Sequence, residues 1–135
     1  CEEHDIENPF VTISSDTTQE WREYERFNTA ILNAYVQPTF VKYIEKLESA
    51  LKEEGFGGTF YLTLASGGMV TAKYAKKFPI TTVEGGPISG IMGGTSIGEV
   101  LDEEDIIIID GGSTTTKAGL AEDLTPKTKT EYWLE

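Results

Sequence analysis

The chain has 135 residues, of which 39% are hydrophobic and 10% aromatic, and this composition indicates a globular domain with its own core rather than a disordered segment. Its 23 acidic and 11 basic side chains give a net charge of −12, which opposes nonspecific binding to nucleic acid. No apolar run approaches the roughly 18 residues of a membrane span, and the single cysteine, Cys1, excludes an intrachain disulfide and favours a cytoplasmic location.

The first half of the chain predicts two helices. Ser15 or Asp16 is a candidate N-cap for a helix that runs from about Thr18 past Tyr35. Pro38 is expected to kink it or to begin a second helix over 39–54, which Gly55 ends. Apolar residues recur at spacings of three and four on faces expected to pack in the core. They are Trp21, Tyr24, Phe27, Ile31, Leu32 and Tyr35, then Phe40, Tyr43, Ile44, Leu47 and Leu51.

The second half predicts alternating strands and helices. Strands are expected at 59–65, 80–84, 105–110 and 117–122, and helices at 71–78 and from Gly85 to about Leu101. The consecutive isoleucines of the strand at 105–110 predict burial on both faces. A further strand is possible in the tail at 125–135, where Thr128, Thr130 and Tyr132 alternate with charged residues. The order predicts an α/β fold with a sheet covered by helices.

A cluster of small and hydroxyl side chains follows the isoleucine strand. Its members are Asp110, Gly111, Gly112, Ser113, Thr114 and Thr115. Paired glycines let backbone N–H groups converge on phosphate oxygens, and the hydroxyls can donate to the same oxygens. Asp110, at the carboxyl end of the strand, is a candidate Mg²⁺ ligand. An Asp-Gly pair is also typical of a plain β-hairpin, and a hairpin can itself bind phosphate, so both interpretations stay open.

Glycines also open and line the helix that precedes this strand. The N–H groups of Gly85 and Gly86 could contact an anion at the helix N-terminus. Alternatively, Gly86, Gly90, Gly93 and Gly94 fall at helical spacings and would let another element pack closely.

Two weaker signals have plain structural readings. The Ser66-Gly67-Gly68 segment either lines a pocket or forms a simple turn. His4, the only histidine, is either a surface residue or a metal ligand with its acidic neighbours. With one cysteine and one histidine, neither a Cys/His zinc site nor a Ser-His-Asp triad can be composed.

Four segments together resemble the hydantoinase A/oxoprolinase family in order and spacing, from about Ser14 to the end of the chain. They are REYERFNTAILNAYVQP at 22–38, SGGM at 66–69, EGGPISGIMGG at 84–94 and IDGGSTTTKAGL at 109–120. The resemblance implies the actin-like ATPase fold, in which ribonuclease-H-like halves enclose a nucleotide, with ATP and Mg²⁺ as cofactors. It places Asp110, Gly111, Gly112, Ser113 and Lys117 near the family's second phosphate loop. Either one residue is missing before the glycine pair or the later part of the loop has gained one, and serine replaces the usual threonine.

The resemblance also implies an activity and partners. The family includes N-methylhydantoinases, 5-oxoprolinases and subunits of acetone and acetophenone carboxylases, which couple ATP hydrolysis to amide-ring opening or carboxylation. The substrate would be of the hydantoin, oxoproline or ketone type, and a second, hydantoinase B-like subunit would be the partner. Asp110 and Lys117 are the expected catalytic residues. Lys117 favours the carboxylase side and would neutralise a phosphoryl group or carboxyphosphate, unless it is a solvated strand lysine.

Other family features are missing or altered. The first phosphate loop and the adenosine-binding segment are not found, and Ala65 and Gly85 stand where the family usually carries serine. Residues 1–135 are therefore expected to be a single domain and a fragment of a larger chain, inactive on its own. Two alternatives are a fragment of another actin-like protein, such as a sugar kinase or ATPase activator, and a non-catalytic interaction domain whose glycines serve packing.

Overall fold

The computed structural model describes residues 10–113 and 115–127, which divide into two compact units. The first unit takes in the residues up to Leu62 together with Met69–Val83, and the second takes in Thr63–Gly68 and the residues from Glu84 onward. Helices and small sheets make up the described chain, so the predicted α/β class is confirmed. That residues 1–135 form one domain of a longer chain stays a prediction.

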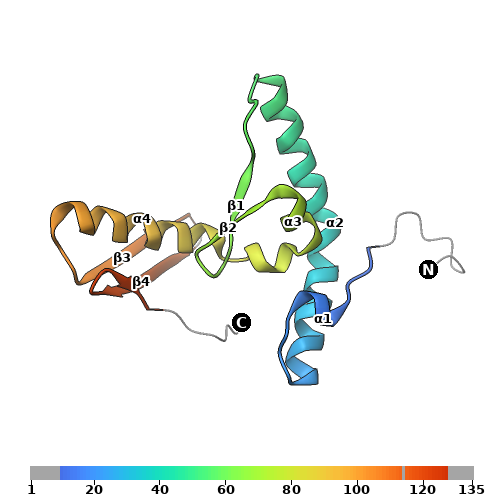
Figure 1. The fold of residues 1–135 in the computed structure, drawn as a ribbon, viewed down its shortest axis with the longest axis horizontal. Helices are drawn as coiled ribbons and strands as arrows, with labels where there is room; N and C mark the ends of the chain where they lie inside the picture. The colour runs from blue at the N-terminus through green and yellow to red at the C-terminus, as the bar shows by residue number, and fades with distance from the viewer. Residues whose placement is uncertain (1–9, 114, 128–135) are drawn as a thin grey trace, which may run out of the picture. The chain divides into compact units, whose positions relative to one another are not determined.

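The first unit is built on one long helix (Figure 1). This helix, α2 (Glu23–Glu53), lies against the single turn α1 (Ser14–Thr17), the short helix α3 (Ala72–Lys77) and the 3₁₀ helix η2 (Pro79–Thr82). The strands β1 (Tyr61–Thr63) and β2 (Met69–Thr71) pair in a two-stranded sheet. Gly55 follows α2 with a φ of 83°, which confirms its predicted place at the helix end.

Of the two alternatives predicted at Pro38, the start of a second helix is wrong, because α2 runs through the proline for 31 residues, and a kink stays a prediction. A proline inside a helix removes one backbone hydrogen bond and crowds the preceding turn, at a cost of about 3 kcal/mol. The buried residues Gln37 and Ile44 stand on either side of Pro38. Packing on both sides of the proline therefore holds the two halves in one helix. The start was also misplaced, since Ser15 and Asp16 belong to α1 and not to the cap of α2.

The packed face of α2 contains two buried amides where an aromatic face was predicted. Its buried residues are Ala30, Asn33, Gln37 and Ile44, whereas Tyr24 is 72% exposed and Tyr35 is 80% exposed. Helical spacing showed correctly which side chains share a face, but it does not say which face meets the rest of the protein. Among the described residues, the core prediction is therefore wrong for these exposed aromatic side chains and is confirmed for Ile44, which is 0% exposed.

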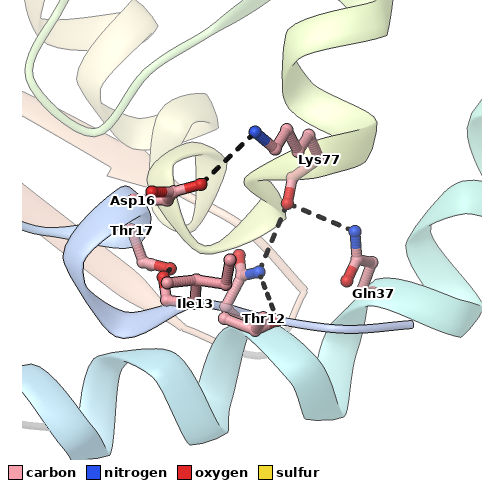
Figure 2. A network of polar contacts seen from close by, with 7 residues as sticks. Thr12, Ile13, Asp16, Thr17, Gln37 and Lys77 are labelled. Atoms are coloured by element: carbon pink, nitrogen blue, oxygen red, sulfur yellow. Dashed lines mark hydrogen bonds and ion pairs between the residues drawn. The ribbon is translucent and has the colours of Figure 1, made fainter. Parts of the chain in front are cut away.

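Two buried amides join α2 to the end of α3. The Asn33 Nδ2 group donates to Lys77 O at 3.3 Å and to Thr12 Oγ1 at 3.1 Å, while Asn33 Oδ1 accepts from Ile80 N at 3.2 Å. Gln37 Nε2 donates to Lys76 O at 2.9 Å and to Lys77 O at 3.2 Å. Figure 2 shows the part of this network around the Lys77 carbonyl and Thr12, together with the ion pair between Lys77 and Asp16, whose charged atoms are 3.6 Å apart. The amides thus satisfy carbonyls that the C-terminus of α3 leaves without helical partners.

The segment predicted as a strand at 80–84 is helical instead. Pro79 begins η2, and the Thr81 and Thr82 hydroxyls donate to Phe78 O and Pro79 O at 2.7 and 2.8 Å. Side chains that bond their own backbone in this way compete with strand pairing. The strand β2 was not predicted, because its three residues are too few to show a period.

In the second unit, α4 (Gly85–Leu101) lies along an antiparallel sheet of β3 (Ile106–Gly111), β4 (Thr116–Glu122) and β5 (Thr125–Pro126). Two glycines of α4 meet isoleucines of β3. A Cβ atom on Gly94 would lie 2.5 Å from Ile108 Cγ1, and one on Gly98 would overlap Ile106. The packing interpretation of the glycines is therefore confirmed for Gly94, and Gly98 adds a second contact of the same kind.

The other glycines of the predicted packing set do not pack. A Cβ atom on Gly86, Gly90 or Gly93 would meet no described residue within 4 Å. The isoleucine strand also departs from the prediction of burial on both faces. Ile107 is 71% exposed and Ile109 is 68% exposed, on the face of the sheet away from α4. Of the predicted tail strand, only Thr125–Pro126 lies among the described residues, and Thr128, Thr130 and Tyr132 lie outside them.

No helix in residues 10–113 and 115–127 combines the length and the apolar composition that crossing a membrane requires.

Neighbouring glycines of α4 should respond oppositely to alanine. Gly94→Ala forces a methyl group against Ile108 and should lower the free energy of unfolding by about 1–2 kcal/mol. Gly93→Ala meets open space and should raise it by about 0.5–1 kcal/mol through helix propensity. Urea denaturation of both variants measures the difference, and equal effects would contradict the packing of α4 on β3.

Asn33 is expected to be a major stabiliser of the first unit. Asn33→Ala removes three hydrogen bonds at a residue that is 1% exposed and should cost about 2–3 kcal/mol in the free energy of unfolding. Asn28→Ala, on the same helix and only half-buried, is the matched control and should cost less than about 0.5 kcal/mol. Thermal and urea unfolding compare the two, and similar losses would argue against the network.

Candidate functional site

The predicted phosphate loop connects β3 to β4 as a hairpin. Gly111 pairs with Thr116 in the ladder, and Gly112 N donates to Thr115 O at 2.9 Å, which closes the loop. The hairpin interpretation of the Asp-Gly-Gly motif is thus confirmed for the backbone. Among the described loop residues, Asp110, Gly111, Gly112, Ser113 and Thr115 are exposed, so neighbouring side chains do not bury the loop. Thr114 lies outside the described residues.

The register of the hairpin places Asp110 and Lys117 on the face of the sheet that packs on α4. These residues are cross-strand partners, and they continue the row that Ile108 and Gly119 occupy on the same face. That face packs on α4, since Gly94 of the helix meets Ile108 and Ile91 meets Gly119. The two predicted catalytic side chains therefore lie on the helix-facing side of the sheet, at the end of β3 where the loop begins.

Lys117 forms an ion pair with Glu84, the residue that precedes α4. The side chains are 35% and 25% exposed, so the pair is half-buried rather than fully solvated. This contact joins the two glycine-containing motifs, which are 33 residues apart in the chain. Lys117 is therefore not a freely solvated strand lysine.

Glu84 was not predicted as a site residue. Its backbone is left-handed, with a φ of 66°, a conformation that costs a residue with a side chain roughly 1–2 kcal/mol. Strained positions of this kind gather at functional sites. The sequence shows an acidic residue directly before Gly85-Gly86-Pro87. Its role becomes evident only in the structure, where Lys117 forms an ion pair with it.

The two glycines at the start of α4 differ in role. Gly85 is buried, and a Cβ atom there would overlap the carbonyl oxygen of Thr63 in β1. Gly86 is exposed, and in the part of the chain that the structure describes a Cβ atom there would meet nothing within 4 Å and no side chain caps this end of the helix. Close packing therefore explains Gly85, and anion binding by either glycine stays a prediction. Gly67, in the Ser66-Gly67-Gly68 segment, has a φ of 89° in a turn closed by Leu64 N to Gly68 O at 2.7 Å, which supports the turn interpretation.

A small hollow lies beside the Lys117 side chain, between α4 and the hairpin. Its walls are formed by Pro87, Ile91, Ile108, Asp110, Lys117, Ala118 and Gly119. Its volume is about 10 Å³, space for about one water molecule. A larger ligand would thus approach from the exposed loop and touch this hollow only at its edge.

A magnesium ion would find one protein ligand here. In the part of the chain that the structure describes, no three Asp, Glu, His or Cys side chains gather closely enough to hold a metal. Asp110 alone is exposed beside the loop, whereas the Glu84 carboxylate is held by Lys117. One carboxylate fits Mg²⁺, which keeps several waters and takes phosphate oxygens as its other ligands. His4 lies outside the described residues.

A shifted pKa is found at a surface ion pair outside this site. A hydrogen bond to Glu122, together with the charge of that carboxylate, raises the pKa of Lys127. This exposed pair, with its charged atoms 2.6 Å apart, joins the end of β4 to the residue after β5. It therefore reflects a surface ion pair.

Comparison with known proteins identifies the class. Residues 26–134 match the model of the hydantoinase/oxoprolinase family. A 125-residue match to the uncharacterized protein MJ0964 of Methanocaldococcus jannaschii is 34% identical and covers 93% of this chain and 18% of that protein. The acetone carboxylase beta subunit of Xanthobacter autotrophicus is 34% identical over 110 residues, 82% of this chain and 15% of the subunit.

A solved structure agrees with these matches. The nucleotide-free structure of acetone carboxylase, described for ATP-dependent acetone carboxylation, superposes with a TM-score of 0.74 at 32% identity. The match covers 82% of this chain and 15% of that one, and it supports the expected relation to the actin-like ATPase fold. The chain belongs to the hydantoinase/oxoprolinase family, and it spans less than a fifth of the length of these relatives.

The Glu84–Lys117 pair should be measurable as a coupling energy. We expect a double-mutant cycle of Glu84→Gln and Lys117→Met to give a coupling of about 0.5–1 kcal/mol, a value discounted for the partial exposure of both side chains. A parallel cycle on the exposed pair Glu122–Lys127 should give a smaller coupling. Additive effects at Glu84 and Lys117 would mean that the pair does not form in solution.

Proposed function

We propose that this chain supplies the phosphate-binding hairpin of an ATP-dependent enzyme, and that the enzyme is of the ketone carboxylase type. Membership of the family and the identity to the acetone carboxylase beta subunit support the class. The observation that carries the proposal is the position of the Glu84–Lys117 pair beside an exposed glycine and hydroxyl loop. A cation held at the base of such a loop fits the binding of phosphate oxygens.

Different residues of the hairpin would make different contacts with the phosphate. Gly111, with open space where a Cβ atom would stand, would let a phosphate approach the backbone. The hydroxyls of Ser113, Thr114 and Thr115 would donate to its oxygens. The N–H group of Gly112 is already bonded to Thr115 O, so its contribution would require the loop to open. Phosphoryl transfer depends mainly on such positioning and on charge neutralisation.

The charges at the site predict a requirement for a divalent cation. Asp110 and Glu84 each carry a negative charge and Lys117 a positive one, so these three groups sum to −1. A nucleotide phosphate would therefore meet net repulsion unless Mg²⁺ accompanied it. Asp110 would hold that ion directly or through water, and the ion when bound would neutralise developing charge on the phosphate. Lys117 would exchange part of its contact with Glu84 for a contact with the phosphate.

The proposed substrate and partner rest on the family relationship alone. A ketone is the proposed small-molecule substrate because Lys117 and the acetone carboxylase matches point to the carboxylase side. Ring opening of a hydantoin or oxoproline would use the same ATP site, and the family name includes these activities. A relative that is itself named as a subunit supports a second, hydantoinase B-like subunit as the partner.

The proposal predicts magnesium-dependent binding of ATP at the hairpin. Titration of the full chain with Mg²⁺-ATP, followed by amide NMR, should shift the resonances of residues 110–117 before those of other segments. Asp110→Asn should weaken the binding by about tenfold or more, the size expected for loss of one charge-assisted contact.

The matched control is Asp102→Asn, at the far end of α4, where the left-handed backbone tolerates asparagine. This variant should bind like the unmodified chain. Binding that is independent of Mg²⁺, equal in both variants, or absent from the hairpin up to about 10 mM nucleotide would contradict the proposal.

A further inference from the structure

The packing of the second unit does not explain why residue 84 is a glutamate. The backbone of Glu84 is left-handed, with a φ of 66° and a ψ of 8°, a conformation that glycine adopts without strain and glutamate does not. A half-buried ion pair adds at most about as much stability as this backbone removes. Stability alone therefore does not account for the carboxylate, and a residue held in such strain is typical of a functional site.

The start of α4 holds Glu84 in place. Gly85 packs so closely on Thr63 that a Cβ atom there would overlap the Thr63 carbonyl oxygen. Ser89 Oγ lies 2.9 Å from Thr63 Oγ1 and donates to Gly85 O at 2.8 Å. Ile88 N donates to Glu84 O at 3.2 Å. These contacts restrain the backbone at Glu84 and after it, whereas the long, flexible stem of its lysine partner can turn toward a ligand.

The surroundings of Lys117 strengthen the effect of the carboxylate. Lys117 lines the small hollow between α4 and the hairpin together with the apolar residues Pro87, Ile91 and Ile108. Apolar walls of low dielectric constant concentrate the field of the charges beside them. The Glu84 side chain is itself only 25% exposed. Its charge is therefore felt at Lys117 more strongly than that of a fully solvated acid.

We propose that Glu84 is a specificity-determining residue, which restricts the loop after β3 to phosphates that arrive as a complex with Mg²⁺. This inference rests on the proposed function, in which the loop binds the phosphates of ATP. Glu84 engages the ammonium group of Lys117 and keeps the net charge of the site negative. Because Mg²⁺ cancels part of the charge of a triphosphate, the carboxylate opposes the metal-free form more strongly than the complex.

The selectivity would serve an enzyme that hydrolyses ATP. Hydrolysis releases inorganic phosphate, which carries the same oxygens as the nucleotide and could occupy the same amides, hydroxyls and lysine. With Glu84 in place, metal-free phosphate must displace a carboxylate and meets net repulsion. Glu84 would thus keep the loop open for the next Mg²⁺-ATP rather than raise its affinity for phosphate.

Calorimetric titration of the full chain with ATP, once with Mg²⁺ and once with EDTA, tests the proposal. The measured quantity is the ratio of the Kd for metal-free ATP to the Kd for Mg²⁺-ATP, and amide NMR of residues 110–117 verifies that each form binds at the hairpin. Glu84→Gln should lower this ratio by at least about fivefold, mainly by tightening the binding of metal-free ATP. Inorganic phosphate should also bind this variant more tightly than the unmodified chain. General damage to the fold would weaken both forms of ATP and leave the ratio unchanged.

Two further variants separate the charge of Glu84 from strain and from net charge. Glu84→Gly removes the carboxylate and relieves the left-handed backbone, so it should lower the ratio as Glu84→Gln does but unfold at a higher temperature than that variant. Glu122→Gln removes the same charge at the far end of β4, roughly 17 Å from Lys117 along the strand. In about 0.15 M salt the Debye length is about 8 Å, so this control should keep the ratio of the unmodified chain.

The outcomes distinguish this inference from the proposed function. If the unmodified chain binds Mg²⁺-ATP selectively at the hairpin, an unchanged ratio in Glu84→Gln would overturn the inference and leave the proposed function standing. An equal change in Glu122→Gln would do the same, because it would reveal a general effect of net charge. An unmodified chain that binds neither form at the hairpin, or binds both equally, would overturn the proposed function and this inference with it.

Discussion

The close contact between α4 and β3 is the constraint on which the candidate site depends. Gly94 and Gly98 lack the side chains that would hold the helix away from Ile108 and Ile106. This contact fixes which face of the hairpin meets the helix, and strand alternation then places Asp110 and Lys117 on that face. A larger residue in the helix would move the sheet outward and separate Lys117 from Glu84. The same two glycines thus determine both the packing of α4 on β3 and the position of the Glu84–Lys117 ion pair.

The Glu84–Lys117 pair favours a functional interpretation of the two motifs that it joins. Each motif taken singly has a plain structural explanation, a hairpin turn for one and close packing for the other. Their shared ion pair, formed at a left-handed residue before the helix, is not required by either explanation. It sets a positive charge beside an exposed loop and restrains it with a carboxylate. A phosphate would have to compete with that carboxylate for the lysine.

The sequence predicted much of the fold because local rules decide much of it. Helix α4, the hairpin strands and the glycine after α2 follow from period, turn residues and caps. The polar packing of α2 could not be predicted, since Asn33 and Gln37 become useful only when carbonyls at the end of α3 meet them. Pro38 does not end the helix, because tertiary packing outweighs its helix-breaking tendency, and the sequence alone does not show that packing. Asp110 and Lys117 were found from their motif, whereas Glu84 needed the three-dimensional contact.

The most direct test is a crystal structure of the chain with Mg²⁺ and a non-hydrolysable ATP analogue. The account predicts phosphate oxygens against the loop after β3, with the Lys117 ammonium turned from Glu84 toward them and the ion beside Asp110. A nucleotide bound elsewhere on the chain, with the Glu84–Lys117 pair unchanged, would contradict it.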